Sequence, residues 1–305
     1  MDGLLVSLQG AAAQGVLWGV MVIGVYITFR LMNIADMTCD GSFALGGCIC
    51  AVLVVSMGVD PVLAIALAML AGVAAGAVTG ILHTMFEIPA ILAGILTQIS
   101  LWSINLRIMG GKSNIPLLKT PTVISSLADS TGMTQSAASL MVGFVVVTAV
   151  IVITYWFFGT ELGSALRATG NNEDMIRAQG VDTRFTKLVA LMVSNGLVAL
   201  SGALVCQSQK YADIGSGTGA IVIGLAAIVI GEVLMGRLIP FYWKLIATVV
   251  GSVVYFMIRA IVLRLGLNAN DMKLLSAVIV ALALSIPVAM AKYRISHSYR
   301  EGGEE

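Results

Sequence analysis

Charged residues are scarce in this chain. Of its 305 residues, 11% are Asp, Glu, Lys or Arg and 58% are hydrophobic, against about 25% and about 45–50% in ordinary soluble domains. A water-soluble fold of this length could not bury so much apolar surface, so a water-soluble enzyme or binding module is excluded. The net charge of +1 excludes a nucleic-acid partner, which would require a basic excess gathered on one face.

Metal-ligating residues and targeting signals are also lacking. The chain has two histidines, His83 and His297, and its four cysteines lie in or beside apolar runs, where free thiols behave as small hydrophobes. Cys48 and Cys50 lack the two-residue spacer of zinc or redox pairs, so no metal site is expected. No basic segment precedes the first apolar run, so we expect that run to remain in the mature protein.

A nucleotide-binding loop is missing as well. The pattern G-x-x-x-x-G-K-[ST] has one lookalike, Gly110-Gly111-Lys112-Ser113, but Leu106 occupies its first glycine position. No strand is expected before it. We therefore interpret the match as coincidence and expect no cofactor in this chain.

What the sequence does contain is a series of long apolar runs. Since a bilayer core about 30 Å thick requires roughly 20 apolar residues per helix, they predict an all-α, polytopic membrane bundle of about nine transmembrane helices, within a range of about 8–10. The whole chain, residues 1–305, is expected to form one membrane domain. The runs are Gly10 to Phe29, Ser42 to Met57, Pro61 to Leu82, Pro89 to Leu106, Ser136 to Phe158, Leu188 to Cys206, Thr218 to Leu234, Phe241 to about Leu263, and Leu274 to Ala291.

The distribution of Lys and Arg predicts the orientation, although the bias is small. It favours a cytoplasmic C-terminus and a cytoplasmic segment 159–187. With nine crossings the N-terminus then lies outside, and the loop 107–135, with no evident fold of its own, is the largest external segment. The polar stretch Asn33 to Gly41, directly before a short run, indicates that some helices are broken within the membrane.

The hydrophilic interruption at residues 159–187 is the most informative segment. Asn172 is a good N-cap, Glu173 and Asp174 follow in the first turn, and Gly180 suits a helix C′ position. These signals predict a short helix from Glu173 to Gln179. From physical reasoning alone, a helix that docks into a partner and an ordinary solvated loop are equally good interpretations.

The same segment carries a resemblance to a known family. The run from Leu162 to Asn172, followed by Ala178, Gly180-Val181 and Lys187, resembles the cytoplasmic coupling segment of ATP-binding cassette (ABC) importer permeases for branched-chain amino acids and ribose-type sugars. Weaker likenesses lie in the first helix pair and near the C-terminus. The stretch Ile34 to Gly41 departs from the branched-chain pattern, and the nearest similarity is to a branch working with tryptophan- or tyrosine-type binding proteins.

The resemblance implies a non-catalytic permease of the bacterial plasma (inner) membrane. Its expected substrate is a small solute, and the class that the resemblance favours is an aromatic or branched-chain amino acid. It implies three protein partners: an ABC ATPase subunit that holds ATP and Mg²⁺, an extracytoplasmic substrate-binding protein, and a second permease copy. Arg167 and Arg177 would offer charged contacts to the ATPase, Met175 and Ile176 apolar ones, and Gly170 and Gly180 sharp turns at either end. The full set of expected coupling residues is Leu166, Arg167, Gly170, Asn172, Glu173, Met175, Ile176, Arg177 and Gly180.

Polar residues inside or beside the apolar runs are candidates for the translocation path, because such groups are costly in lipid unless they face a partner or a cavity. The alternative is that they form hydrogen bonds between helices, worth well under about 2 kcal/mol each. The candidates are Asn33, Asp36, Thr38, Asp40, Ser42, Gln98, Asn105 and Asn195.

Two other functions remain open from the sequence. A secondary transporter would have an intramembrane charged residue for its coupling ion and often an internal repeat, and neither is evident. An integral membrane enzyme would require a cluster of histidines or carboxylates, and the two histidines make this the weakest alternative. Glu232, at the end of an apolar run, is interpreted as either an ATPase contact or a marker of the membrane interface.

Overall fold

The computed structural model describes residues 2–118, 120–236 and 240–265, together with six single positions between 274 and 285. Eight helices in these ranges are long and apolar enough to cross a membrane, which confirms an all-α polytopic bundle. The ninth expected run, Leu274 to Ala291, and the C-terminal tail lie almost entirely outside the described residues.

The first half of the chain supplies four spans. Helix α1 (Asp2–Tyr26) continues directly into a π-helical turn, η1 (Ile27–Leu31), and a non-helical stretch then leads to α2 (Thr38–Ser56). The helices α3 (Pro61–Thr84) and α4 (Ala90–Ile108) follow. The expected break before the second run is therefore present, but α2 begins four residues earlier than the run at Ser42.

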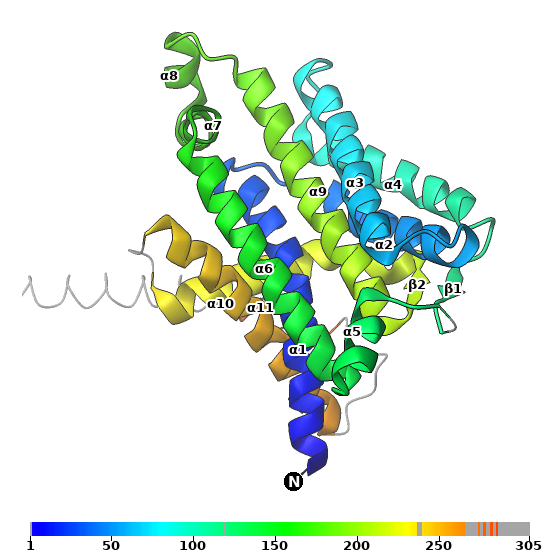
Figure 1. Cartoon of the computed structure of the whole chain (residues 1–305). Coiled ribbons are helices and arrows are strands. Elements are labelled where there is room, and N and C mark those ends of the chain that lie inside the picture. Colours follow the sequence, from blue (N-terminus) through cyan, green and yellow to red (C-terminus); the bar gives the residue numbers. More distant parts are fainter. Residues whose placement is uncertain are drawn as a thin grey trace, which may run out of the picture.

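The second half supplies the remaining spans and the short elements. In chain order these are β1 (Asn114–Pro116), α5 (Val123–Thr131), α6 (Gln135–Gly159), α7 (Glu161–Asn171), α8 (Glu173–Ala178), α9 (Thr183–Gln209), β2 (Tyr211–Asp213), the 3-10 turn η2 (Ile214–Gly217), α10 (Ala220–Met235) and α11 (Phe241–Arg264). Figure 1 shows α7 and α8 at one end of the bundle and α5 at the other.

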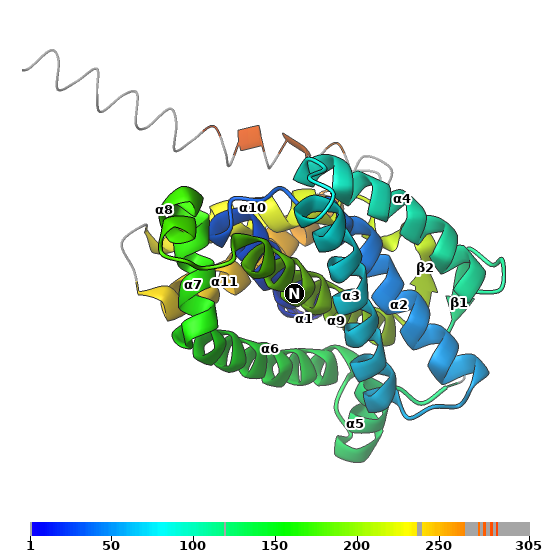
Figure 2. The same cartoon turned by 90° about the horizontal axis from the view of Figure 1, so that it is seen from above.

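Helices α1 and α9 form the centre of the bundle (Figure 2), with 78% and 72% of their apolar windows buried. Close approach to α9 depends on small residues. A Cβ added at Gly46 of α2 would lie 2.0 Å from the Ala199 carbonyl oxygen, and one at Gly76 of α3 would lie 2.2 Å from that of Leu191. The glycines and alanines of these runs thus serve helix packing, as is usual in membranes.

The loop 107–135 has a fold of its own, contrary to the sequence-based expectation. Strand β1 pairs antiparallel with β2, with Ile115 opposite Ala212, and Thr122 and Ser125 form a capping box at the start of α5. The backbone N–H of Val123 donates to Gln207 Oε1 at 2.9 Å, which ties the loop to the end of α9. The pairing joins segments about a hundred residues apart, so local pattern could not reveal it.

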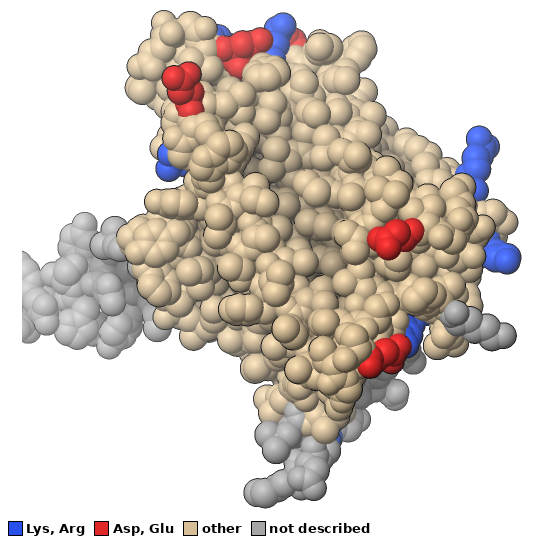
Figure 3. Space-filling view, viewed as in Figure 1, with Lys and Arg blue, Asp and Glu red and all other residues tan. Residues whose placement is uncertain are grey.

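Charged side chains gather at the two ends of the molecule. In Figure 3, Lys, Arg, Asp and Glu lie over the α7–α8 end and along the opposite edge, while the surface between them is nearly free of charge. An apolar belt between two charged ends is the pattern expected of a chain that spans a bilayer.

Candidate functional site

The helix pair α7–α8 lies beyond the membrane spans and is defined by side-chain caps. The Gly163 N–H donates to Thr160 Oγ1 at 3.3 Å at the start of α7, and the Met175 N–H donates to Asn172 Oδ1 at 3.0 Å at the start of α8. Gly180 has a φ of +85° just after α8. The predicted short helix is therefore present, with its N-cap as expected, but α7 was not foreseen.

Helix α8 is fastened to the start of α9 through one carboxylate. Glu173 accepts hydrogen bonds from Lys187 Nζ at 2.6 Å, Arg177 at 2.9 Å and Thr183 Oγ1 at 3.1 Å. The hydrogen bond from Lys187, with the charges of Lys187 and Arg177, holds the pKa of Glu173 below its ordinary value. The stability that this carboxylate contributes is therefore present above its unfolded pKa and is lost as the pH falls through the lower folded value.

The two apolar residues of α8 have different surroundings. Ile176 is 5% exposed, so in this chain it packs inside, against the expectation that it would contact a partner. Met175 is 53% exposed and is therefore the apolar side chain that α8 presents outward. Leu166 of α7 is also buried.

Gly170 has a different role from the one the sequence indicated. It lies inside α7 rather than at a turn, and a Cβ there would be 1.7 Å from the Leu31 carbonyl oxygen. Helix α7 therefore rests directly on the backbone at the end of η1. This contact joins the α7–α8 pair to the non-helical stretch that leads into α2.

Arg167 fastens the other side of α7. Its Nη2 donates to the Phe158 carbonyl oxygen at 2.8 Å, and its guanidinium lies 5.5 Å from the centre of the Phe241 ring. The side chain thus bridges the end of α6 and the start of α11. The α7–α8 pair is therefore in contact with η1, α6, α9 and α11.

A buried polar network lies where α2, α3 and α9 meet. Asn195 Nδ2 donates to Asp36 Oδ2 at 2.7 Å, and Ser42 Oγ donates to Asn195 Oδ1 at 2.7 Å. Thr38 Oγ1 lies 2.8 Å from Thr79 Oγ1. Four of the predicted path residues, Asp36, Thr38, Ser42 and Asn195, are therefore brought together. All four are buried, and they form hydrogen bonds with one another.

The remaining path candidates are separate from that network. Asp40 accepts hydrogen bonds from the backbone N–H groups of Gly219 and Ile221, so it caps α10. Asn105 is buried, with its Nδ2 only 3.5 Å from the Gly41 carbonyl oxygen. Gln98 is half-buried on α4. Asn33 is exposed and has a φ of +55°. It lines a cavity of about 490 Å³ together with Glu173 and Lys187.

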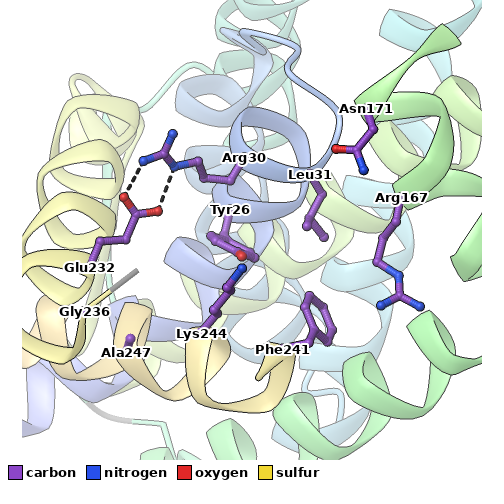
Figure 4. A pocket seen from close by; sticks show the side chains of 10 residues that line it. All are labelled: Tyr26, Arg30, Leu31, Arg167, Asn171, Glu232, Gly236, Phe241, Lys244 and Ala247. Carbon is purple, nitrogen blue, oxygen red and sulfur yellow. Dashed lines mark hydrogen bonds and ion pairs between the residues drawn. The ribbon is translucent and has the colours of Figure 1, made fainter. Parts of the chain in front are cut away.

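One ion pair was missed by sequence reasoning. Arg30 Nε donates to Glu232 Oε1 at 2.7 Å, and its Nη2 donates to Glu232 Oε2 (Figure 4). The pair connects η1 to α10 at the α7–α8 end of the bundle. Each of the two residues lies at the end of an apolar run, so each could be recognised from the sequence as a charge at the membrane boundary. Their separation of 202 positions is the reason that the sequence did not reveal the pairing.

The lookalike nucleotide loop lies elsewhere. Gly110 and Gly111, with φ values of +65° and +80°, form a turn between α4 and β1. A helix rather than a strand precedes this turn, so Lys112 lacks the setting of a phosphate-binding loop. Among the described residues, no group of three or more His, Cys, Asp and Glu could hold a metal ion.

This architecture, an apolar bundle of eight candidate spans with a helical pair at one end, defines a polytopic membrane protein. The family described as branched-chain amino acid transport system / permease component matches residues 7–286. The chain belongs to this family.

Comparison with individual proteins gives the same family. The chain is 38% identical over 267 residues to the tyrosine transport system permease protein of Clostridioides difficile, covering 88% of this chain and 86% of that protein. It is 30% identical over 279 residues to an uncharacterised protein of Rickettsia prowazekii, covering 90% and 95%. It is 23% identical over 270 residues to the ribose import permease protein of Escherichia coli, covering 88% and 81%. No solved structure matches the chain significantly.

Proposed function

We propose that this chain is the membrane subunit of an ABC importer that carries an aromatic or branched-chain amino acid, with tyrosine the first candidate. The observation that carries the proposal is the α7–α8 pair, which lies beyond the spans and is fastened to four of them. The tyrosine permease relative supports the substrate class. ATP hydrolysis belongs to a separate subunit, and an extracytoplasmic binding protein delivers the substrate to a permease dimer.

In this proposal, α8 is the element that the ATPase contacts. Met175 and Arg177 are exposed on it, while Glu173 and Ile176 hold it to the bundle. Movement of the ATPase would then displace α7 against Leu31 and shift the stretch that leads into α2. In this proposal the assembly lies in the bacterial plasma (inner) membrane.

Uptake in reconstituted vesicles tests the function. The chain is reconstituted with an ABC ATPase subunit and a substrate-binding protein from the same organism, and labelled tyrosine, leucine and ribose are offered with internal or external ATP. We expect uptake of an amino acid that requires ATP on the ATPase side and the binding protein. Uptake by the chain alone, driven by an ion gradient, would instead show a secondary transporter.

Substitution of Met175 by Asp tests the coupling surface. A charge on the exposed face of α8 leaves the fold intact, because the side chain is 53% exposed, but it places a desolvated charge in the ATPase contact. We expect about a tenfold or greater loss of ATPase copurification and of uptake. Met133→Asp, at a residue 47% exposed and near α5, is the matched control and should behave as the parent. If the Met175 variant copurified with normal amounts of ATPase and took up substrate at the parental rate, α8 would be a solvated segment with no role in ATPase contact.

Cysteine labelling tests the orientation. The native cysteines Cys39, Cys48, Cys50 and Cys206 are all buried and free, and they would be replaced first. Ser126→Cys on α5 and Gln179→Cys after α8 are exposed and lie at opposite ends of the bundle. In intact cells an impermeant thiol reagent should modify the first and spare the second. The reverse pattern would invert the proposed topology.

A further inference from the structure

A cavity of about 630 Å³ lies between α1, α7, α10 and α11 at the α7–α8 end. Three cationic side chains, Arg30, Arg167 and Lys244, line it with one acidic side chain, Glu232 (Figure 4). Because Glu232 is paired with Arg30, the charges of Arg167 and Lys244 are not balanced by an acid in the cavity lining. The lining therefore favours an anionic ligand.

Lys244 is the most available of these cations. It is half-buried, and its ammonium group has no hydrogen bond or ion pair with any residue that the structure describes. The start of α11 adds to the positive potential, since its N-cap is Pro240, which provides no side-chain acceptor, and the first N–H groups of a helix attract anions.

A second, aromatic cavity beside the first indicates which class of anion would bind. A second cavity, of about 460 Å³, shares Arg167 and Phe241 with the first and is otherwise lined largely by aromatic side chains, among them Tyr155, Trp156 and Tyr242. The Tyr155 and Tyr242 rings meet edge to face at 6.1 Å, and Trp156 is 71% exposed. Exposed Tyr and Trp mark the level of lipid headgroups, so the basic cavity opens at that level.

We propose that this paired cavity binds the headgroup of an anionic phospholipid, with the phosphodiester between Lys244 and Arg167 and the glycerol and upper acyl chain against the aromatic cavity. A basic pocket between membrane helices is the usual form of such a site. The lipid would bridge α7 and α11 and so stabilise the position of the segment that we assign to coupling. Binding itself requires only that the chain spans a bilayer.

Native mass spectrometry of the purified full chain, without ATPase, tests the site. The chain is extracted from vesicles of equal phosphatidylglycerol and phosphatidylcholine, and retained lipids are counted. We expect one phosphatidylglycerol per chain, about a fivefold weaker affinity in Lys244→Gln, and recovery in Lys244→Arg. Lys112→Gln, at an exposed lysine of the opposite end, is the control and should retain lipid normally.

Three outcomes would overturn the inference. One is equal retention of phosphatidylcholine, and another is unchanged retention in Lys244→Gln. The third is thermal stabilisation by inorganic phosphate as large as that by phosphatidylglycerol, because the site would then bind free anions. In the second case, a separate copurification measurement on the assembled complex would assign the cavity to the ATPase contact if Lys244→Gln lost ATPase. Because these measurements omit transport, failure of the lipid site and failure of the proposed import function remain distinguishable.

Discussion

Gly170→Ala should reduce uptake by about tenfold or more while the protein still reaches the membrane. The added Cβ would lie 1.7 Å from the Leu31 carbonyl oxygen and 3.0 Å from the Met32 Cα, so α7 must move away from η1 before the methyl group fits. Overpacking of this kind costs about 1–3 kcal/mol. Since both contacts are to backbone, no side-chain rotation relieves them.

The result should appear in coupling more than in folding. Displacing α7 separates the α7–α8 pair from the stretch leading to α2, so ATP hydrolysis should lose its stimulation by substrate together with uptake. Gly159→Ala, at the end of α6 close by, is the matched control, because a Cβ there meets nothing within 4 Å. Uptake of the Gly170 variant at the parental rate would show that the contact with Leu31 carries no coupling.

Features encoded by neighbouring residues could be predicted from the sequence. The Asn172 cap, the acidic first turn of α8 and the positive φ at Gly180 each depend on the backbone within a few positions. The spans were recognisable because each must be apolar over its own length. Local chemistry therefore predicted the class of fold and the position of the short helix.

Features that depend on distant parts of the chain could not be predicted. Helix α7 was missed because Gly163 and Gly170 inside it have low helix propensity, and their value lies in close contact with backbone elsewhere. Asp40 looked like a path residue, but its carboxyl caps α10, which begins about 180 positions later. A single sequence does not reveal which distant groups meet. For the same reason it did not show that Ile176 is buried in this chain and not presented to a partner.

The Asp36–Asn195–Ser42 network also arises from distant contacts, and Asn195→Leu should be among the most destabilising single substitutions in the bundle. Leucine has a similar size but removes the donor to Asp36 and the acceptor of Ser42. All three residues are at most 2% exposed, so water cannot replace the lost partners. A buried polar group left without its partner costs about 1–3 kcal/mol, and more when charged, so we expect a loss of about 3 kcal/mol or more.

Thermal unfolding in detergent, followed by size-exclusion chromatography with fluorescence detection, measures this loss as a fall in Tm of roughly 6–12 °C. Ser201→Ala is the matched control on the same helix. It also removes a buried hydrogen bond, from Ser201 Oγ to the Leu17 carbonyl oxygen at 2.8 Å, but leaves only a backbone carbonyl behind, so a cost of about 0.6 kcal/mol is expected. A double-mutant cycle with Asp36→Ala and Asn195→Ala should show strong coupling between the two losses of stability. If the two losses were additive, or if the leucine variant lost no more stability than the Ser201 control, Asn195 would be an ordinary interhelical contact. The network would then not hold the stretch between η1 and α2.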